Sequence, residues 1–178
     1  MTIKKCDNMY IRKAVHEDLD VIMSIYHIAQ DFMIESGNPQ WGHSYPTEEL
    51  IQEDIENEVC HLICDDEGIH GVFALFDGIE HTYQYIEDGQ WLNDEPYVTL
   101  HRIASDGKVH GIFKCAINYC KGISDNIRID THKSNLIMRK QIEKNGFQKC
   151  GTIYVRKSPR IAYQWSANIK SKIEKSVL

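Results

Sequence analysis

The segment from residue 97 to residue 147 constrains the fold most, because it reads as strand, turn, helix, strand and helix in that order. Residues 97–104 have strand composition, the polar turn that follows contains Gly107 and Gly111, and an apolar run begins at Ile112. Backbone N–H groups in the first turn of a helix have no intrahelical partner, so they favour an anion in the preceding turn. The two glycines tolerate positive φ and allow a ligand to approach the backbone closely.

A glycine-bearing turn of this kind also occurs as a plain connection, so the residues that follow are needed to decide between the two. Residues 126–131 predict a second short strand, and a helix then opens at Ser134 or Asn135 and runs through Asn145. Gly146 comes next, as expected for the C-terminal stop of a helix. The order favours the anion site.

In this order and spacing the segment resembles the GNAT acetyltransferase superfamily, where the pyrophosphate of acetyl-coenzyme A lies on a turn of the form Gln/Arg-x-x-Gly-x-Gly/Ala. The matching residues here are 108–113, with Lys108 in place of Gln or Arg and Phe113 in place of a small residue. Asn135 and Gly146 keep the spacing of the family's Asn-x-x-Ala-x-x-Leu-Tyr-x-x-x-Gly-Phe helix.

The resemblance covers residues 9–165 and implies an α+β fold. Its features are a mixed, mostly antiparallel twisted sheet of about seven strands flanked by about four helices, with splayed fourth and fifth strands. The chain's own pattern follows the order β-α-α-β-β-β-α-β-α-β-β. We expect an N-terminal extension over 1–8, a single GNAT-like domain over 9–165 and a polar tail over 166–178.

The first half of the chain shows the same order. Strand composition over 10–14 precedes a helical apolar repeat over 16–35. Thr47 is a predicted N-cap of a second helix that ends near Asn57. The turn signal at 65–68 lies between two apolar runs and predicts a hairpin.

Charge and cysteine spacing bear on several classes of function. The net charge of −6 disfavours non-specific binding to nucleic acid or to an anionic membrane. The six cysteines lack Cys-x-x-Cys spacing, so we expect reduced structural thiols and no metal. There is no apolar run near the roughly 20 residues that span a bilayer, and residues 1–7 lack a secretory apolar stretch. We therefore expect a cytoplasmic protein.

By the resemblance, acetyl-coenzyme A is the co-substrate, and its pantetheine arm enters a cleft between 100–104 and 126–131. The backbone amides of the turn matter more than its side chains. Asn135 is expected to contact the pantetheine and also to cap its helix. The predicted cofactor-binding residues are Ile103, Ala104, Lys108, Val109, His110, Gly111, Ile112, Phe113, Thr131 and Asn135.

The reaction needs a base, because a protonated amine is not a nucleophile. His101 is the first candidate: it stands on the strand where related enzymes often carry Glu, and an unperturbed histidine pKa near about 6.5 suits the role. The alternative is a histidine hydrogen-bonded within the sheet. The family's thiolate proton donor is a Tyr at the position of Ile142, so Tyr154, Tyr119 and His132 are the alternatives here, unranked by sequence. The predicted catalytic residues are His101 and Tyr154.

Aromatic residues predict the acceptor pocket, with acids of the 78–96 segment as counter-charges to an amine. The alternative is that most of them are core or edge residues. Their spacing does not distinguish a polyamine, an amino acid, an aminoglycoside or a protein N-terminus. The predicted substrate-binding residues are Trp41, Tyr83, Tyr85, Trp91 and Tyr97.

The combined reading is an N-acetyltransferase that moves the acetyl group of acetyl-coenzyme A directly to a primary amine of a small molecule or peptide. A ping-pong route through Cys120 is a minor alternative. Another class of function is a non-catalytic acyl-coenzyme A sensor or interaction module, which Ile142 and the irregular turn motivate. A homodimer is expected only by analogy with related proteins.

Overall fold

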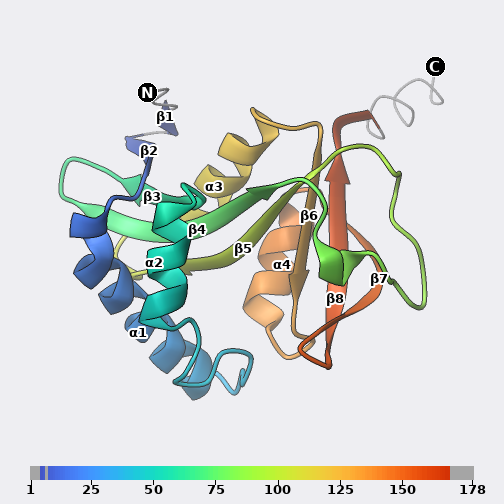
Figure 1. The fold of residues 1–178 in the computed structure, drawn as a ribbon, viewed down its shortest axis with the longest axis horizontal. Coiled ribbons are helices and arrows are strands. Elements are labelled where there is room, and N and C mark those ends of the chain that lie inside the picture. The colour runs from blue at the N-terminus through green and yellow to red at the C-terminus, as the bar shows by residue number, and fades with distance from the viewer. Residues whose placement is uncertain (1–4, 7, 169–178) are drawn as a thin grey trace. The chain divides into compact units, whose positions relative to one another are not determined.

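A computed structural model describes residues 5–6 and 8–168 (Figure 1). The described residues form eight strands in one sheet of order β1-β2-β3-β4-β5-β6-β8-β7, with four α-helices. The chain divides into two compact units. The first unit comprises the described residues up to Leu75 together with Leu100–Tyr119, and the second comprises Phe76–Thr99 and the described residues from Cys120 onward.

The first unit holds most of the N-terminal elements. Strands β1 to β4 form an antiparallel meander, in which each strand pairs with the next one along the chain. Its elements are β1 Lys5–Cys6, β2 Met9–Lys13, α1 Leu19–Glu35, α2 Glu48–Glu56, β3 Cys60–Cys64, β4 Ile69–Asp77, β5 Val98–Ser105 and α3 Ile112–Lys121, with a 3-10 turn over His16–Asp18. The last two residues of β4, the first two of β5 and the last two of α3 belong to the second unit.

The second unit contains the parallel pair of the sheet. Val98 and Thr99 of β5 pair in parallel with Ile127 and Arg128 of β6. β8 then pairs antiparallel with both β6 and β7. The elements of this unit are a 3-10 turn over His81–Tyr83, β6 Asn126–Thr131, α4 Leu136–Lys144, β7 Gln148–Val155 and β8 Ser158–Ser166.

Local side-chain caps fix the starts of two helices. Thr47 Oγ1 accepts a hydrogen bond from the Leu50 N–H at 3.2 Å, as predicted for an N-cap. Asn135 Oδ1 accepts from the Met138 N–H at 3.2 Å and begins α4 in the same way. Both caps satisfy backbone donors that the first turn of a helix leaves without a partner.

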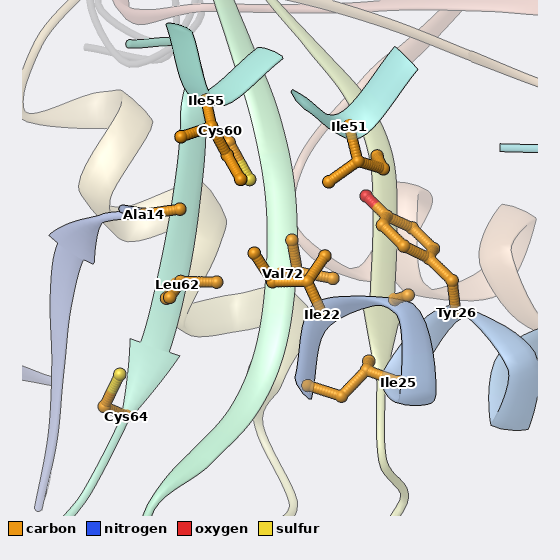
Figure 2. Packing of buried hydrophobic residues seen from close by; sticks show 11 residues of the cluster. Ala14, Ile22, Ile25, Tyr26, Ile51, Ile55, Cys60, Leu62, Cys64 and Val72 are labelled. Atoms are coloured by element: carbon orange, nitrogen blue, oxygen red, sulfur yellow. The ribbon is translucent and has the colours of Figure 1, made fainter. Parts of the chain in front are cut away.

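The core of the first unit lies between α1, α2 and one face of its sheet (Figure 2). Leu62 of β3 and Val72 of β4 point to the same face as Ile22 of α1 and Ile51 of α2. His61 alternates to the opposite face, where its ring lies 5.5 Å from that of Tyr119 on α3. Because both faces are covered, all five residues of β3 are buried.

In the second unit, β8 also alternates between two environments. Ala162 packs with Tyr83 in a buried cluster, and Gln164 Oε1 accepts from the Leu92 N–H at 3.0 Å. Tyr163 faces α4, where its hydroxyl lies 3.2 Å from Glu143 Oε1. The segment between β4 and β5 and the helix α4 therefore cover opposite faces of β8.

The structure confirms the predicted α+β class and the order of its elements. β1 is an additional strand within the expected 1–8 extension. β8 extends through Ser166, so the expected tail begins inside a strand, and residues 169–178 lie outside the described part of the chain. A single domain over 9–165 and the splaying of the two central strands stay predictions. Among the described residues, no helix is long and apolar enough to cross a membrane.

Ile22→Ala should lower the free energy of unfolding by about 2–5 kcal/mol, because it leaves a cavity between α1 and β4. Val21→Ala on the same helix is the matched control, since Val21 is 44% exposed. We expect it to change stability by less than about 0.5 kcal/mol. Urea denaturation of both variants measures the difference, and equal losses would contradict the packing in Figure 2.

Candidate active site

The turn after β5 leads directly into the N-terminus of α3. The Cys115 N–H donates to the Gly111 carbonyl at 2.9 Å, which closes the first helical turn. The N–H groups of Ile112, Phe113 and Lys114 precede that bond, so the helix provides no acceptor for them. Together with the positive end of the helix dipole, they form a site that favours an anion such as a phosphate.

Gly111 fixes the direction from which the chain enters α3. Its φ is 87°, in the left-handed region that residues with a Cβ rarely adopt. A Cβ at this position would meet only Met9 Cε, at 3.8 Å. Backbone conformation, rather than lack of space, therefore requires glycine here.

The side chains of the turn explain how it departs from the family pattern. Phe113, in place of a small residue, is buried, so only its backbone belongs to the anion site. Lys108, in place of Gln or Arg, is 75% exposed, with its Nζ 3.7 Å from Asp106 Oδ2. His110 is also exposed. The recognition that this turn can offer is thus mainly by backbone N–H groups.

Residues that the sequence did not single out hold this turn in place. Asp106 Oδ1 accepts from the Lys108 N–H at 3.0 Å, and the Asp106 N–H donates to the His70 carbonyl at 3.0 Å. The Asp106 Oδ2 also lies 3.0 Å from His70 Nδ1. His70 Nε2 lies 2.9 Å from Asp65 Oδ1, which itself closes the β3–β4 turn by accepting from two backbone N–H groups. The turn is therefore tied to β4 and to the hairpin before it.

His101 lies on β5 and is half-buried, next to a buried ion pair. Arg102 has a φ of 52°, and its Nη2 donates to Asp54 at 2.6 and 2.8 Å while its Nε donates at 3.0 Å. Burial raises the pKa of the Asp54 carboxyl, and the charges of Arg102 and His101 oppose that shift. The Arg102 carbonyl also accepts from the Tyr26 hydroxyl at 2.9 Å. The predicted base thus stands beside a residue whose unusual backbone is held by several contacts.

Trp41 is the predicted acceptor residue that belongs to the first unit. Its ring makes edge-type contacts with Tyr26 and Tyr45, at centroid distances of 5.8 and 6.3 Å. The Tyr45 hydroxyl lies 3.3 Å from Arg102 Nη1. The structure therefore joins Trp41 to the residues around His101 through one aromatic cluster.

The other predicted acceptor residues lie in the second unit, and most are packed. Tyr83 and Tyr97 are buried with Trp91 packed against them, and the Tyr83 hydroxyl donates to Asp130 at 2.7 Å. The Arg128 guanidinium lies between Trp91 and Tyr97, 4.1 and 3.9 Å from their ring centroids. These contacts favour the core interpretation of the three residues. Their role in binding an acceptor stays a prediction.

Tyr154, the predicted proton donor, is on β7 and 42% exposed. Its hydroxyl donates to Glu87 at 2.8 Å, and the Tyr85 hydroxyl donates to the same carboxylate at 2.8 Å. The hydrogen bond to Glu87 raises the pKa of Tyr154. Its catalytic role stays a prediction, and it would require the hydroxyl to leave Glu87.

The other donor candidates are also placed. Ile142 is fully buried, so the position that carries a Tyr in the family faces the core in this chain. His132 Nδ1 lies 2.7 Å from Ser134 Oγ, and burial lowers the pKa of this histidine. Tyr119 packs against His61 in the first unit. Burial raises the pKa of Cys120 to about 12, which argues against a nucleophilic thiolate.

The predicted cofactor-binding residues are divided between the two units. The first unit brings together Ile103 and Ala104 at the end of β5 and the turn from Lys108 to Phe113. The second holds Thr131, buried at the end of β6, and Asn135, the N-cap of α4. The capping role of Asn135 is confirmed, and its contact with the cofactor stays a prediction. Within residues 8–168, no group of His, Cys, Asp and Glu is arranged to hold a metal ion.

Solved structures resemble this chain, although no model of a protein family and no curated protein matches it. A GNAT-family acetyltransferase from Streptococcus agalactiae is 30% identical, with a TM-score of 0.84 over 90% of this chain and 96% of that one. A putative acetyltransferase from Staphylococcus aureus is 23% identical, with a TM-score of 0.63 over 88% and 98%. The ribosomal-protein-alanine N-acetyltransferase of Brucella melitensis is 14% identical, with a TM-score of 0.59 over 88% and 98%.

The fold and the 30% identity over nearly the whole length define this chain as an acyltransferase. It belongs to the GNAT family of acetyltransferases.

Asp54→Ala should lower the free energy of unfolding by about 3–5 kcal/mol, because it leaves the buried Arg102 guanidinium without its carboxylate. Lys13→Ala is the control, since it breaks an ion pair with Glu58 that is exposed on both sides. Such pairs contribute little, so this variant should unfold like the wild type. Chemical denaturation separates the two, and a wild-type value for Asp54→Ala would contradict the proposed importance of the pair.

Proposed function

We propose that this chain is an N-acetyltransferase that transfers the acetyl group of acetyl-coenzyme A directly to a primary amine of a small molecule or peptide. The observation that carries this proposal is the row of N–H groups at the start of α3, entered through Gly111. That arrangement suits a pyrophosphate. Membership of the GNAT family supports acetyl-coenzyme A as the donor that supplies it.

Direct transfer needs few groups from the protein. The neutral amine attacks the thioester carbonyl, the carbon–sulfur bond then breaks, and the coenzyme A thiolate leaves and takes up a proton. His101 is the proposed base that accepts the proton of the amine. A covalent route through a cysteine is disfavoured, because the five cysteines within residues 8–168 are all buried. Burial raises the pKa of Cys60 and of Cys120 to about 12.

The proposed acceptor wall in the first unit consists of Trp41 and the residues around Arg102. Asp54 neutralises the guanidinium of Arg102, so this wall does not repel a cationic amine. Edge-on aromatic rings at Trp41 and Tyr45 add apolar surface. The Brucella neighbour acts on a ribosomal-protein alanine, but at 14% identity it is similar in fold alone, so a protein N-terminus has no priority over other amines.

The test is release of free thiol from acetyl-coenzyme A across polyamines, amino acids, aminoglycosides and peptide N-termini, with binding followed by calorimetry. Release that depends on an acceptor establishes the transferase and identifies the acceptor class. Binding without release for every acceptor favours the second candidate, a non-catalytic acyl-coenzyme A sensor, which the buried Ile142 motivates. Absence of binding would refute both.

Gly111→Ala should raise the dissociation constant of acetyl-coenzyme A about tenfold. An L side chain in the left-handed region costs about 1–2 kcal/mol, and relaxation of the turn would misalign its N–H groups, while about 1.4 kcal/mol corresponds to tenfold in affinity. Gly37→Ala is the matched control, because Gly37 has a φ of 75° at the end of α1, away from the turn. It should lose similar stability but keep the affinity. Equal affinities in the two variants would contradict the backbone site.

His101→Ala should lower kcat by about 10²–10⁴-fold, with little change in the affinity for acetyl-coenzyme A, if His101 is the general base. The pH–rate profile of His101→Ala should then follow the ionisation of the acceptor amine, because only the neutral amine is a nucleophile. His16→Ala, which replaces an exposed histidine before α1, should keep the wild-type profile. A His101→Ala enzyme with unchanged turnover across the pH range would remove His101 from the mechanism.

A further inference from the structure

A buried histidine joins the β3–β4 turn to the proposed phosphate turn. The His70 side chain is only 7% exposed, and its two ring nitrogens each face a carboxylate oxygen. Nε2 lies 2.9 Å from Asp65 Oδ1, and Nδ1 lies 3.0 Å from Asp106 Oδ2. Of the two partners, Asp106 belongs to the turn that precedes α3.

This geometry fits a protonated ring. A neutral imidazole has one donor nitrogen and one acceptor nitrogen, so one of the two carboxylates would face a lone pair. An imidazolium donates to both. Burial lowers the pKa of His70, but the hydrogen bonds and charges of Asp106 and Asp65 outweigh burial and raise the pKa above its ordinary value.

The charge of the ring matters because one of its two carboxylate partners, Asp106, lies within the turn before α3. Asp106 is buried, and one of its oxygens holds the Lys108 N–H while the other faces His70. Lys108 also faces Asp106, but its side chain is largely exposed to solvent. With His70 protonated, the two carboxylates and the ring carry one net negative charge. Without that proton they carry two, next to the site proposed for an anion.

We propose that His70 is a positioning residue whose proton orders the Asp106 turn and makes the affinity for acetyl-coenzyme A fall as the pH rises. This inference depends on the proposed function, because it assumes that the pyrophosphate binds at the start of α3. The protonated ring holds Asp106 away from the ligand and offsets its charge. The deprotonated ring leaves Asp106 repelled by Asp65 and repelling the phosphates.

The direction follows from linkage between proton and ligand. If the ligand binds the protonated form better, affinity is highest below the raised pKa of His70 and declines as the pH passes through it. A one-unit difference between the pKa values of the free and bound protein corresponds to about tenfold in affinity. The stability of the protein without ligand declines in the same direction, since this stabilisation is complete below the unfolded-state pKa of histidine.

Asp106→Asn separates the charge from the shape of the turn. The Asn oxygen can still accept from the Lys108 N–H, and its amide can donate to His70 Nδ1. His70 then needs only its Nε2–H, for Asp65. With the ring neutral the cluster carries one net negative charge, as in the protonated wild type, and loss of the ring proton can no longer bring it to two.

The experiment measures the dissociation constant of acetyl-coenzyme A by calorimetry from pH 6 to 9.5 for the wild type, Asp106→Asn and His70→Gln. Ionisation of the ligand's own phosphates is common to all three proteins, so the ratios report the cluster. The wild type should bind like Asp106→Asn at pH 6 and about tenfold more weakly at pH 9. His70→Gln, which lacks the charge throughout, should bind weakly at every pH. His27→Gln, an exposed histidine on α1, should follow the wild type.

A wild-type to Asp106→Asn ratio that stays constant with pH would overturn the inference while leaving the proposed function intact. Absence of acetyl-coenzyme A binding at any pH would overturn both. Nitrogen NMR of labelled histidines gives a second readout, in the protein without ligand. Both nitrogens of His70 should be protonated at pH 7, and a single neutral tautomer there would refute the proposal even if His70→Gln fails to fold.

Discussion

The hydrogen bonds of Asp106 are the interaction on which the candidate site depends. A buried carboxylate needs partners for both oxygens, since an unpaired buried charge costs several kcal/mol. Here one oxygen accepts from the Lys108 N–H and the other lies within hydrogen-bond distance of His70 Nδ1, while the Asp106 N–H donates to the His70 carbonyl. The turn is thus fixed by β4, and β4 by Asp65 in the hairpin before it. The N–H groups at the start of α3 are held in place by residues that never need to contact a ligand.

A second buried charge organises the part of β5 that carries His101. Arg102 adopts a positive φ, which an ordinary strand residue avoids, and such a conformation persists only where its surroundings enforce it. Asp54 of α2 accepts hydrogen bonds from the Arg102 guanidinium, and the Tyr26 hydroxyl of α1 donates to the Arg102 carbonyl. Helices that also form the hydrophobic core therefore fix the backbone beside the proposed base. In the first unit, α1 and α2 supply both the hydrophobic core and the polar partners of Arg102, so a change in helix packing also changes the backbone beside His101.

Much of the fold could be predicted from the sequence because its signals are local. The caps at Thr47 and Asn135 and the stop at Gly146 lie within a few residues of the turns that they fix. The contact of His70 with Asp106 could not be predicted, since Asp106 lies 36 residues away and nothing local links the two residues. For a related reason, the aromatic residues of the 78–97 segment could not be assigned from the sequence to either the core or an acceptor pocket. An aromatic side chain suits a core and a pocket equally well, and only tertiary contacts showed Tyr83 bonded to Asp130.

The proposed recognition by backbone N–H groups would also explain why the turn is a weak sequence motif but a well-defined structure. N–H groups can bind an anion whatever side chains they carry, provided that φ and ψ are kept. Phe113 can therefore replace a small residue by turning its ring into the core, and Lys108 can replace Gln or Arg from an exposed position. What the sequence has to preserve is Gly111, the buried pair of His70 and Asp106, and the apolar face of α3. Only Gly111 is a single sequence position, whereas the other two features depend on tertiary contacts. The structure can therefore stay similar when the sequence motif is no longer recognisable.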